Sequence, residues 1–415
     1  MRSKNRRNLR VVQPKADPTD EIIDQIMEEL NEEEPLDNLE AKIASHRKKF
    51  WIRVTVIAAS VLAVVIATYL FFNLQTYDSV QVVDTVASDS GDGSYVSFAG
   101  GILKYSKDGV SFLKSNGKEQ WNHSYQIKNP IIDVNDDVAA IADSSGNAIA
   151  VFDGVGLKGE ITTTLPIEKI SVSQQGIVAA ILKNDNSPNV ICYDSAGNIL
   201  VEHKASVTST GYPIDISMSA NGEVLLVTYL YAQDNEVKTK ISFFNFGTAG
   251  QDKTDHLVAE AEYQDAIMPA AFFVSQDTSM VVGDKQILIY DGAQIPELKN
   301  TVELEKEIKS VFHNDKYIGL ILKNEGKEGC ELCIYNTAGK QVMSTDFAGE
   351  YSHVKLVNGQ IIMYDGDQMA IYTLSGRKRF EGQVDAKILE VVPMLGFNKY
   401  LVMSTSGIQT IRLVK

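Results

Sequence analysis

A short apolar run that ends in a bulky, usually aromatic residue recurs eight times along this chain, and this repeat constrains the fold more than any other feature. The bulky anchors are Phe112, Phe152, Tyr193, Phe244, Tyr290, Tyr335, Tyr372 and, in a degenerate copy, Ile411. Successive anchors lie 37 to 51 residues apart, close to the roughly 40 to 50 residues of one four-stranded β-propeller blade. The repeat therefore predicts an all-β fold, an eight-bladed β-propeller, with seven blades as the alternative.

The residues around each anchor predict the strands of a blade. In the first repeat the predicted strands are Tyr95–Phe98, Ile102–Tyr105, Val110–Leu113 and Gln120–Tyr125. Asp108-Gly109 and Asn116-Gly117 lie between them, and such dipeptides favour hairpin turns because both residues adopt positive φ. A continuous apolar run such as Val190-Ile191-Cys192-Tyr193 suits a strand that neighbouring blades cover on both faces.

The last repeat is one strand short. It contains Ile388–Val392, Tyr400–Met403 and Ile408–Leu413, after which the chain stops. Ser79–Ala87 is predicted to be a strand that precedes the first blade. Pairing it beside Ile408–Leu413 would close the ring and remove an exposed sheet edge. We therefore predict closure by this amino-terminal strand.

One hydrophobic span lies near the amino end. Val54–Phe72 contains 19 residues without a charge, and as a helix they cover about 28 Å, the thickness of one hydrocarbon core. Four basic residues flank its amino side, namely Arg47, Lys48, Lys49 and Arg53. On the carboxyl side no Lys or Arg occurs before Lys104. Because positive flanks stay in the cytoplasm, the amino terminus is predicted to be inside and the propeller outside.

This topology predicts three regions. Residues 1–49 form a partly disordered cytoplasmic tail, residues 50–73 a transmembrane helix and residues 74–415 an extracytoplasmic propeller. The predicted location is the plasma membrane of a bacterium, with a single pass. A cleaved signal peptide is the alternative, but it would need a basic leader of roughly 50 residues, and no small-x-small cleavage site closely follows the apolar run.

The net charge of −15 is confined to the predicted outside region, because residues 1–53 hold 11 basic and 11 acidic residues. An acidic propeller does not bind nucleic acid or anionic lipid by charge, since either needs a basic surface. Solubility is the simplest role of this charge, and a cation-binding surface is the alternative.

The tail contains a candidate docking helix. Asp17-Pro18-Thr19-Asp20 offers an N-cap and a proline at the first helical position. Apolar residues follow at helical spacing, with acidic residues largely on the other side: Ile22, Ile23, Ile26 and Leu30. A helix this short is marginal alone and gains from a partner groove; a solvated stalk is the alternative. A second polar helix is predicted from Leu36 through Ala44.

Three cysteines do not form a disulfide framework. Cys330 and Cys333 match the C-x-x-C spacing of a redox pair. On a strand, however, residues three apart point to opposite faces and lie about 10 Å from each other, too far for a disulfide. No second Cys or His pair lies at zinc-ligand spacing. We therefore predict structural cysteines.

The segment Lys114-Ser115-Asn116-Gly117-Lys118-Glu119-Gln120-Trp121 resembles the quinoprotein-type repeat, in which a turn ending Gly-Lys leads to a tryptophan that docks between blades. Tyr335–Lys340 and Tyr193–Asn198 are similar to its first half but lack the tryptophan. Over residues 79–415 the chain resembles membrane-anchored bacterial propellers of uncharacterised function with quinoprotein-like or WD40-like repeats, and also the propeller scaffold lipoproteins of outer-membrane assembly. Quinoprotein dehydrogenase activity would further imply adjacent cysteines, which the sequence lacks.

The sequence contains no recognisable catalytic constellation. It has neither H-E-x-x-H nor G-x-S-x-G, and the acidic turn at Asp133–Asp137 lacks the spacing of an EF-hand. His313 is predicted to be a turn residue. We predict no catalytic, cofactor-binding or metal-ligating residue and no cofactor.

Blade four is irregular, with the longest anchor spacing, 51 residues. Polar Ala232–Lys240 and a further segment, Gly247–Asp265, are predicted to be inserted loops, and loops on a rigid scaffold are common binding sites. The candidate partner-binding residues are Tyr229, Tyr231, Phe246 and Tyr263. Packing within the propeller is the alternative role for these aromatic residues.

These features favour a non-enzymatic binding or scaffold module of the cell envelope, whose partner is a protein or another envelope component. One alternative is a propeller enzyme acting on envelope glycans, with carboxylates converging on the central channel. A second is a transmembrane sensor that signals through the candidate docking helix.

Overall fold

The computed structural model describes residues 36–86, 93–114, 117–185, 187–233, 236–396 and 398–415. The chain forms two compact units, which meet between Leu74 and Gln75. The candidate docking residues Ile22, Ile23, Ile26 and Leu30 lie outside the described residues.

The first unit contains one helix, α2 (Leu36–Asn73). Its segment Ser45–Phe71 is long and apolar enough to cross a membrane. The helix begins at Leu36, so the predicted polar helix and the apolar span are continuous. Thr55 and Ser60 donate their hydroxyls to the carbonyls of Trp51 and Val56, both at 2.8 Å. These bonds satisfy the polar side chains within an apolar segment.

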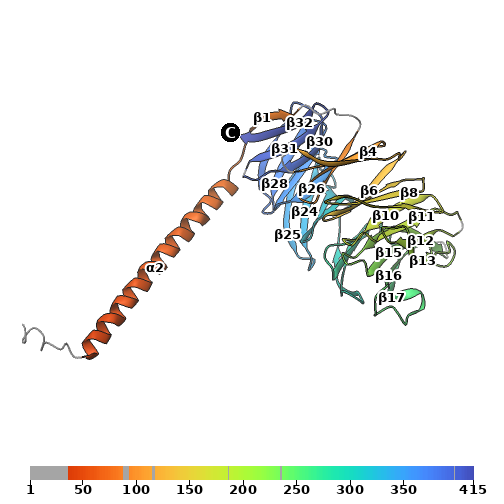
Figure 1. The fold of residues 1–415 in the computed structure, drawn as a ribbon, viewed down its shortest axis with the longest axis horizontal. Coiled ribbons are helices and arrows are strands. Elements are labelled where there is room, and N and C mark those ends of the chain that lie inside the picture. The colour runs from red at the N-terminus through yellow and green to blue at the C-terminus, as the bar shows by residue number, and fades with distance from the viewer. Residues whose placement is uncertain (1–35, 87–92, 115–116, 186, 234–235, 397) are drawn as a thin grey trace, which may run out of the picture. The chain divides into compact units, whose positions relative to one another are not determined.

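The described residues of the second unit form eight four-stranded antiparallel sheets, the blades of a β-propeller (Figure 1). Blades one to four comprise β2 (Ser94–Phe98), β3 (Gly101–Tyr105), β4 (Gly109–Leu113) and β5 (Glu119–Ser124); β6 (Pro130–Asn135), β7 (Val138–Asp143), β8 (Ala148–Asp153) and β9 (Gly156–Thr162); β10 (Ile167–Val172), β11 (Val178–Leu182), β12 (Asn189–Tyr193) and β13 (Ile199–Lys204); and β14 (Tyr212–Met218), β15 (Val224–Gln233), β16 (Glu236–Asn245) and β17 (Leu257–Gln264), with a short 3₁₀ helix η1 (Thr254–His256) before β17.

Blades five to eight complete the ring. They comprise β18 (Ala270–Phe273), β19 (Thr278–Val282), β20 (Gln286–Asp291) and β21 (Glu297–Glu303); β22 (Ile308–His313), β23 (Tyr317–Lys323), β24 (Cys330–Asn336) and β25 (Gln341–Phe347); β26 (His353–Val357), β27 (Gln360–Asp365), β28 (Gln368–Thr373) and β29 (Lys378–Gln383); and β30 (Ile388–Pro393), β31 (Lys399–Ser404), β32 (Gly407–Val414) and β1 (Ser79–Val86). The eight-bladed prediction is confirmed.

Blade eight is built from both ends of the second unit. Strand β1 pairs antiparallel with β32, and Val80 lies opposite Leu413. Figure 1 shows the orange β1 beside the blue β32. The predicted closure is confirmed, and it occurs because β32 would otherwise present an unpaired edge.

The core is divided among the junctions between blades. Eight hydrophobic clusters of the described residues each join two neighbouring blades. The second and third strands are buried on both faces, as in β11 and β12, which explains the continuous apolar runs of the sequence. Trp121 stacks on Phe152 of blade two at 5.6 Å between ring centroids and donates its Nε1 hydrogen to the Gly154 carbonyl at 3.3 Å. The docking of this tryptophan between blades is thus confirmed.

The first strands of neighbouring blades contact one another and surround the propeller axis. Strands β10, β14, β22 and β30 each carry a register shift. Bulges re-aim side chains, and Lys169, Asp215 and Glu390 each lie directly after such a shift. The fold thereby brings ionisable side chains to the axis from strands that are mostly apolar.

Candidate functional site

A cavity of about 390 Å³ lies at the axis, between the first strands of blades one, six, seven and eight. Its polar lining comes from Ser97, His313, His353, Lys355, Tyr364 and Glu390. Apolar side chains, among them Val96, Val354 and Leu356, form other parts of its wall. This volume falls within the range of small-molecule sites, roughly 300 to 1,000 Å³.

An ion pair between Lys355 and Glu390 joins blades seven and eight in this cavity. Their side chains are 22% and 10% exposed. Glu390 also accepts hydrogen bonds from the Tyr364 hydroxyl at 3.3 Å and from the Val391 amide at 3.0 Å. Desolvation by the surrounding strands lowers the pKa of Lys355 from its ordinary value, while the adjacent carboxylate favours the charged form. Burial raises the pKa of Tyr364 to about 12, so its hydroxyl stays protonated and donates.

Two histidines line the same cavity. His313 stacks on Phe272 of blade five, with ring centroids 3.8 Å apart and an interplanar angle of 1°. His353 stacks on Tyr364 at 4.9 Å and 16°. Burial lowers the pKa of His313 to about 4, although its ring reaches solvent through the cavity. The prediction of a turn residue is wrong, because His313 pairs with Ile318 and ends β22.

Two further carboxylates lie on the first strands of blades two and four. Asp133 accepts a hydrogen bond from the Val172 amide at 2.7 Å, and Asp215 accepts one from the Ala271 amide at 2.8 Å. Lys169 donates to Asp215 at 2.8 Å. Burial raises the pKa of both carboxyl groups. Each carboxylate therefore holds the first strand of its own blade to that of the next.

Glycoside hydrolysis generally uses two carboxylates that flank the scissile bond. Among the described residues that line the axial cavity, the carboxylate is Glu390 alone. The cavity thus does not supply the converging pair that the glycan-enzyme hypothesis requires.

The four aromatic residues predicted to bind a partner on blade four do not converge. Tyr229 is fully buried between blades three and four and therefore packs in the core. Tyr231 lies under the Lys240 ammonium, 5.8 Å from ring centroid to nitrogen, and its hydroxyl donates to Glu262. Tyr263 lies against Tyr290 of blade five, with the two hydroxyl oxygens 3.1 Å apart.

Phe246 lies at the other end of the blade. Tyr231 and Tyr263 pair with Lys238 and Thr239 near the start of β16, whereas Phe246 follows its end. At roughly 3.3 Å per residue this separation is about 25 Å. Phe246 instead lines a cavity of about 310 Å³ on the outer rim, beside His203 and His256. Tyr231 and Phe246 are therefore too far apart to belong to the same small contact with a partner.

The predicted loop at Ala232–Lys240 is largely strand. Strands β15 and β16 each contain ten residues and pair from Val224–Asn245 to Gln233–Glu236. The polar residues misled the sequence prediction because their side chains have partners within the sheet: Lys238 and Lys240 form ion pairs with Glu262 and Glu260, and both Lys238 and Thr239 are buried.

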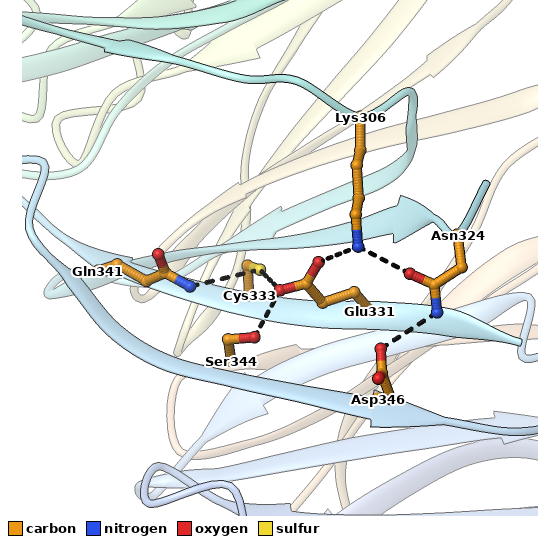
Figure 2. A network of polar contacts seen from close by, with 7 residues as sticks. All are labelled: Lys306, Asn324, Glu331, Cys333, Gln341, Ser344 and Asp346. Carbon is orange, nitrogen blue, oxygen red and sulfur yellow. Dashed lines mark hydrogen bonds and ion pairs between the residues drawn. The ribbon is translucent and has the colours of Figure 1, made fainter. Parts of the chain in front are cut away.

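The C-x-x-C pair is not a redox site. Cys330 and Cys333 are buried free thiols. Figure 2 shows Cys333 within a polar network, where it donates to Glu331 at 3.2 Å and accepts from Gln341 at 3.7 Å. Burial raises the pKa of Cys333 to about 12, which disfavours the reactive thiolate.

The same network fixes the connection between blades five and six (Figure 2). Lys306 donates to Glu331 at 2.5 Å and to Asn324 at 2.8 Å. Ser344 donates to the second oxygen of Glu331, also at 2.5 Å. These donors lower the pKa of Glu331 to about 2, with the Lys306 bond as the largest contribution. We assign the network a structural role.

The axial cluster was not predicted from the sequence. Its available signal was a charged residue at the centre of an otherwise apolar first strand, as in Val354-Lys355-Leu356 and Leu389-Glu390-Val391. Such a residue at a buried position needs a partner. The partner of Lys355 is Glu390 on the next blade, and the sequence alone does not show that these two strands are neighbours.

Two solved structures are similar to this chain at low sequence identity. BamB from Moraxella catarrhalis is 13% identical, with a TM-score of 0.47, covering 81% of this chain and 100% of its own. The Pan2 WD40 domain of Neurospora crassa is 11% identical, with a TM-score of 0.42, covering 69% of this chain and 90% of its own. No curated protein matches the chain. The sequence resemblance to propellers of uncharacterised function is confirmed by a family model that matches residues 73–413. The chain belongs to the family described as "Family of unknown function (DUF5711)".

Proposed function

We propose that this protein is a single-pass, membrane-anchored propeller that binds a protein or another component of the cell envelope without catalysing a reaction. The amino-terminal tail lies in the cytoplasm and the propeller outside. The observation that carries the proposal is the long hairpin of β15 and β16 on blade four.

This hairpin extends past its own sheet. Strand β14 pairs with β15 as far as Tyr212–Leu230, and strand β17 pairs with β16 as far as Lys238–Gln264. Two residue pairs of β15 and β16 lie beyond both of these strands, Ala232–Val237 and Gln233–Glu236. The corresponding hairpin of blade five, β19–β20, pairs over five residues. A minimal blade does not need the extra length, and projections from a rigid scaffold commonly carry binding.

The base of the projecting part carries an aromatic ring and charged side chains from β15, β16 and β17. Tyr231 contacts Lys240, and Lys238 lies 3.6 Å from Glu262. Val237 is 40% exposed at the same end. Aromatic residues with a polar rim are typical of protein interfaces, and the side chains are held by neighbouring strands before any partner arrives.

Site-specific photocrosslinking tests the proposal. A photoreactive residue at position 231 in native membranes should give a discrete crosslinked product. The matched control is Lys285, an exposed residue in the turn of the shorter β19–β20 hairpin of blade five. This turn lies on the same face of the propeller as the β15–β16 hairpin. Products of equal yield at both positions, or none at position 231 under several growth conditions, would contradict a specific contact at this hairpin.

A further inference from the structure

The axial cavity has an imbalance between hydrogen-bond donors and acceptors. Glu390, its carboxylate, already accepts from the Lys355 ammonium, the Tyr364 hydroxyl and the Val391 amide. The acceptor capacity of this group is therefore largely used within the protein. The Lys355 ammonium has three N–H donors. One of them is used in the hydrogen bond to Glu390, so the group has donors left for a ligand.

The two histidines add hydrogen-bonding groups that the fold does not use. Within the described part of the chain, the imidazole rings of His313 and His353 make no side-chain hydrogen bond, and each ring is instead held by stacking on an aromatic ring. Both side chains reach solvent. A neutral imidazole carries one N–H donor and a protonated one carries two, so the cavity offers donors from two neighbouring blades.

Apart from Ser97, the rest of the wall is apolar. Val96, Val354 and Leu356 line it together with the aromatic faces described above. A ligand that fits these surfaces has an anionic oxygen group for the donors and a compact carbon skeleton for the wall. A bare inorganic anion would leave the apolar part without a partner.

We propose that the axial cavity binds a small organic anion, whose carboxylate or phosphate group contacts Lys355, His313 and His353. This site is independent of the blade-four hairpin and lies within the ring rather than on its surface. The other lysine and carboxylates at the axis do not compete for the ligand, because Lys169 and Asp215 pair with each other and Asp133 accepts a backbone amide.

Isothermal titration calorimetry on the full-length protein in non-ionic detergent tests this site. Phenyl phosphate and benzoate serve as the anionic probes, and benzyl alcohol is the uncharged control. We expect at least one anion to bind about tenfold or more tightly than benzyl alcohol, as charge-assisted hydrogen bonds predict. The tighter of the two anions identifies the preferred group.

Substitutions then locate the binding. Lys355→Met should weaken binding of the anion about tenfold or more. The matched control is Lys169→Met, which disrupts the other lysine–carboxylate pair of the first strands and should leave affinity within about twofold. His313→Gln and His353→Gln keep the Lys355–Glu390 pair intact, so they decide the question even if Lys355→Met fails to fold; each should weaken binding by a few-fold.

Two results would overturn the proposal. One is the absence of measurable binding of both anions to the folded wild type at about 10 mM, the weak limit of a specific site. The other is binding that both histidine variants leave unchanged, since this would place the anion elsewhere on the protein.

Discussion

At the scale of single residues, the propeller combines apolar junctions with a few ionisable groups whose protonation depends on burial. His313 and Glu331 are the two clearest cases, and they shift in ways that oppose acid. For His313, desolvation by the neighbouring strands favours the neutral ring, although the residue is partly exposed. For Glu331 the surrounding donors favour the carboxylate. Both effects make the folded state bind protons less readily than the unfolded chain.

His313 predicts a loss of stability in mild acid. Its pKa is about 4 in the folded protein and 6.5 in the unfolded chain, so the unfolded state binds more protons between these values. Stability therefore falls as pH is lowered from about 6.5 to about 4. Thermal unfolding midpoints of the wild type and of His313→Gln, measured across this window, should converge on acidification. Parallel pH profiles would contradict the assignment.

The lowered pKa of Glu331 predicts that stability also depends on pH in a second, more acidic range. Because its pKa falls from 4.5 to about 2 on folding, its contribution is complete above about 4.5 and is lost as pH falls towards 2. Glu331→Gln should lower the free energy of unfolding at pH 7 by about 1 to 3 kcal/mol. The control is Glu307→Gln, because Glu307 and Lys323 form an exposed pair, 68% and 55% accessible, that contributes little. Equal effects of the two substitutions would contradict the claim that the network stabilises the fold more than an exposed ion pair does.

At the scale of strands and hairpins, the β15–β16 extension is separable from the fold. Replacing Tyr231–Lys238 with Asn-Gly joins Leu230 directly to its partner Thr239 through a two-residue turn that favours hairpins. The unfolding midpoint should change little, because most of the removed residues lie beyond the pairs with β14 and β17, while the partner identified by crosslinking should no longer copurify with the protein. Shortening Gly283–Gln286 of the β19–β20 hairpin to Asn-Gly is the matched control and should leave crosslinking at position 231 intact. Persistent partner capture by the shortened blade-four variant would contradict the proposed function.

The same scale shows what the sequence could predict. Anchors such as Phe152 and Tyr193 mark third strands that are buried on both faces, so their period gave the blade number. The hairpin was misinterpreted as a loop because Lys238 and Lys240 reach ion-pair partners on β17 while Thr239 is buried. Local polarity alone does not separate these cases.

The axial cluster was beyond local prediction for a different reason. His313, Lys355 and Glu390 are spread over three blades and 78 residues. Their proximity depends on closure of the whole ring and on the register shift that precedes Glu390. The sequence showed a charge in an apolar strand, but neither its partner nor the cavity beside it.

At the scale of the whole molecule, the orientation across the membrane is open to a direct labelling test. The native cysteines are buried, so an introduced cysteine is the accessible thiol. Val155→Cys, at a turn position that is 87% exposed on the propeller, should react with a membrane-impermeant maleimide in intact cells. Arg47→Cys, on the basic flank of the helix, should react only after permeabilisation. The reverse pattern would contradict the proposed topology.

The central claim is that eight blades form one ring, closed by β1 against β32. Gln81 lies opposite Arg412 in this pairing, whereas Gln409 lies opposite Thr85. Directly opposed residues on antiparallel strands are close enough for a disulfide. Under oxidising conditions Gln81→Cys with Arg412→Cys should therefore form an intramolecular disulfide in the full-length protein, and Gln81→Cys with Gln409→Cys should not. Failure of the first pair to crosslink in folded protein, or efficient crosslinking of the second, would contradict the closed ring.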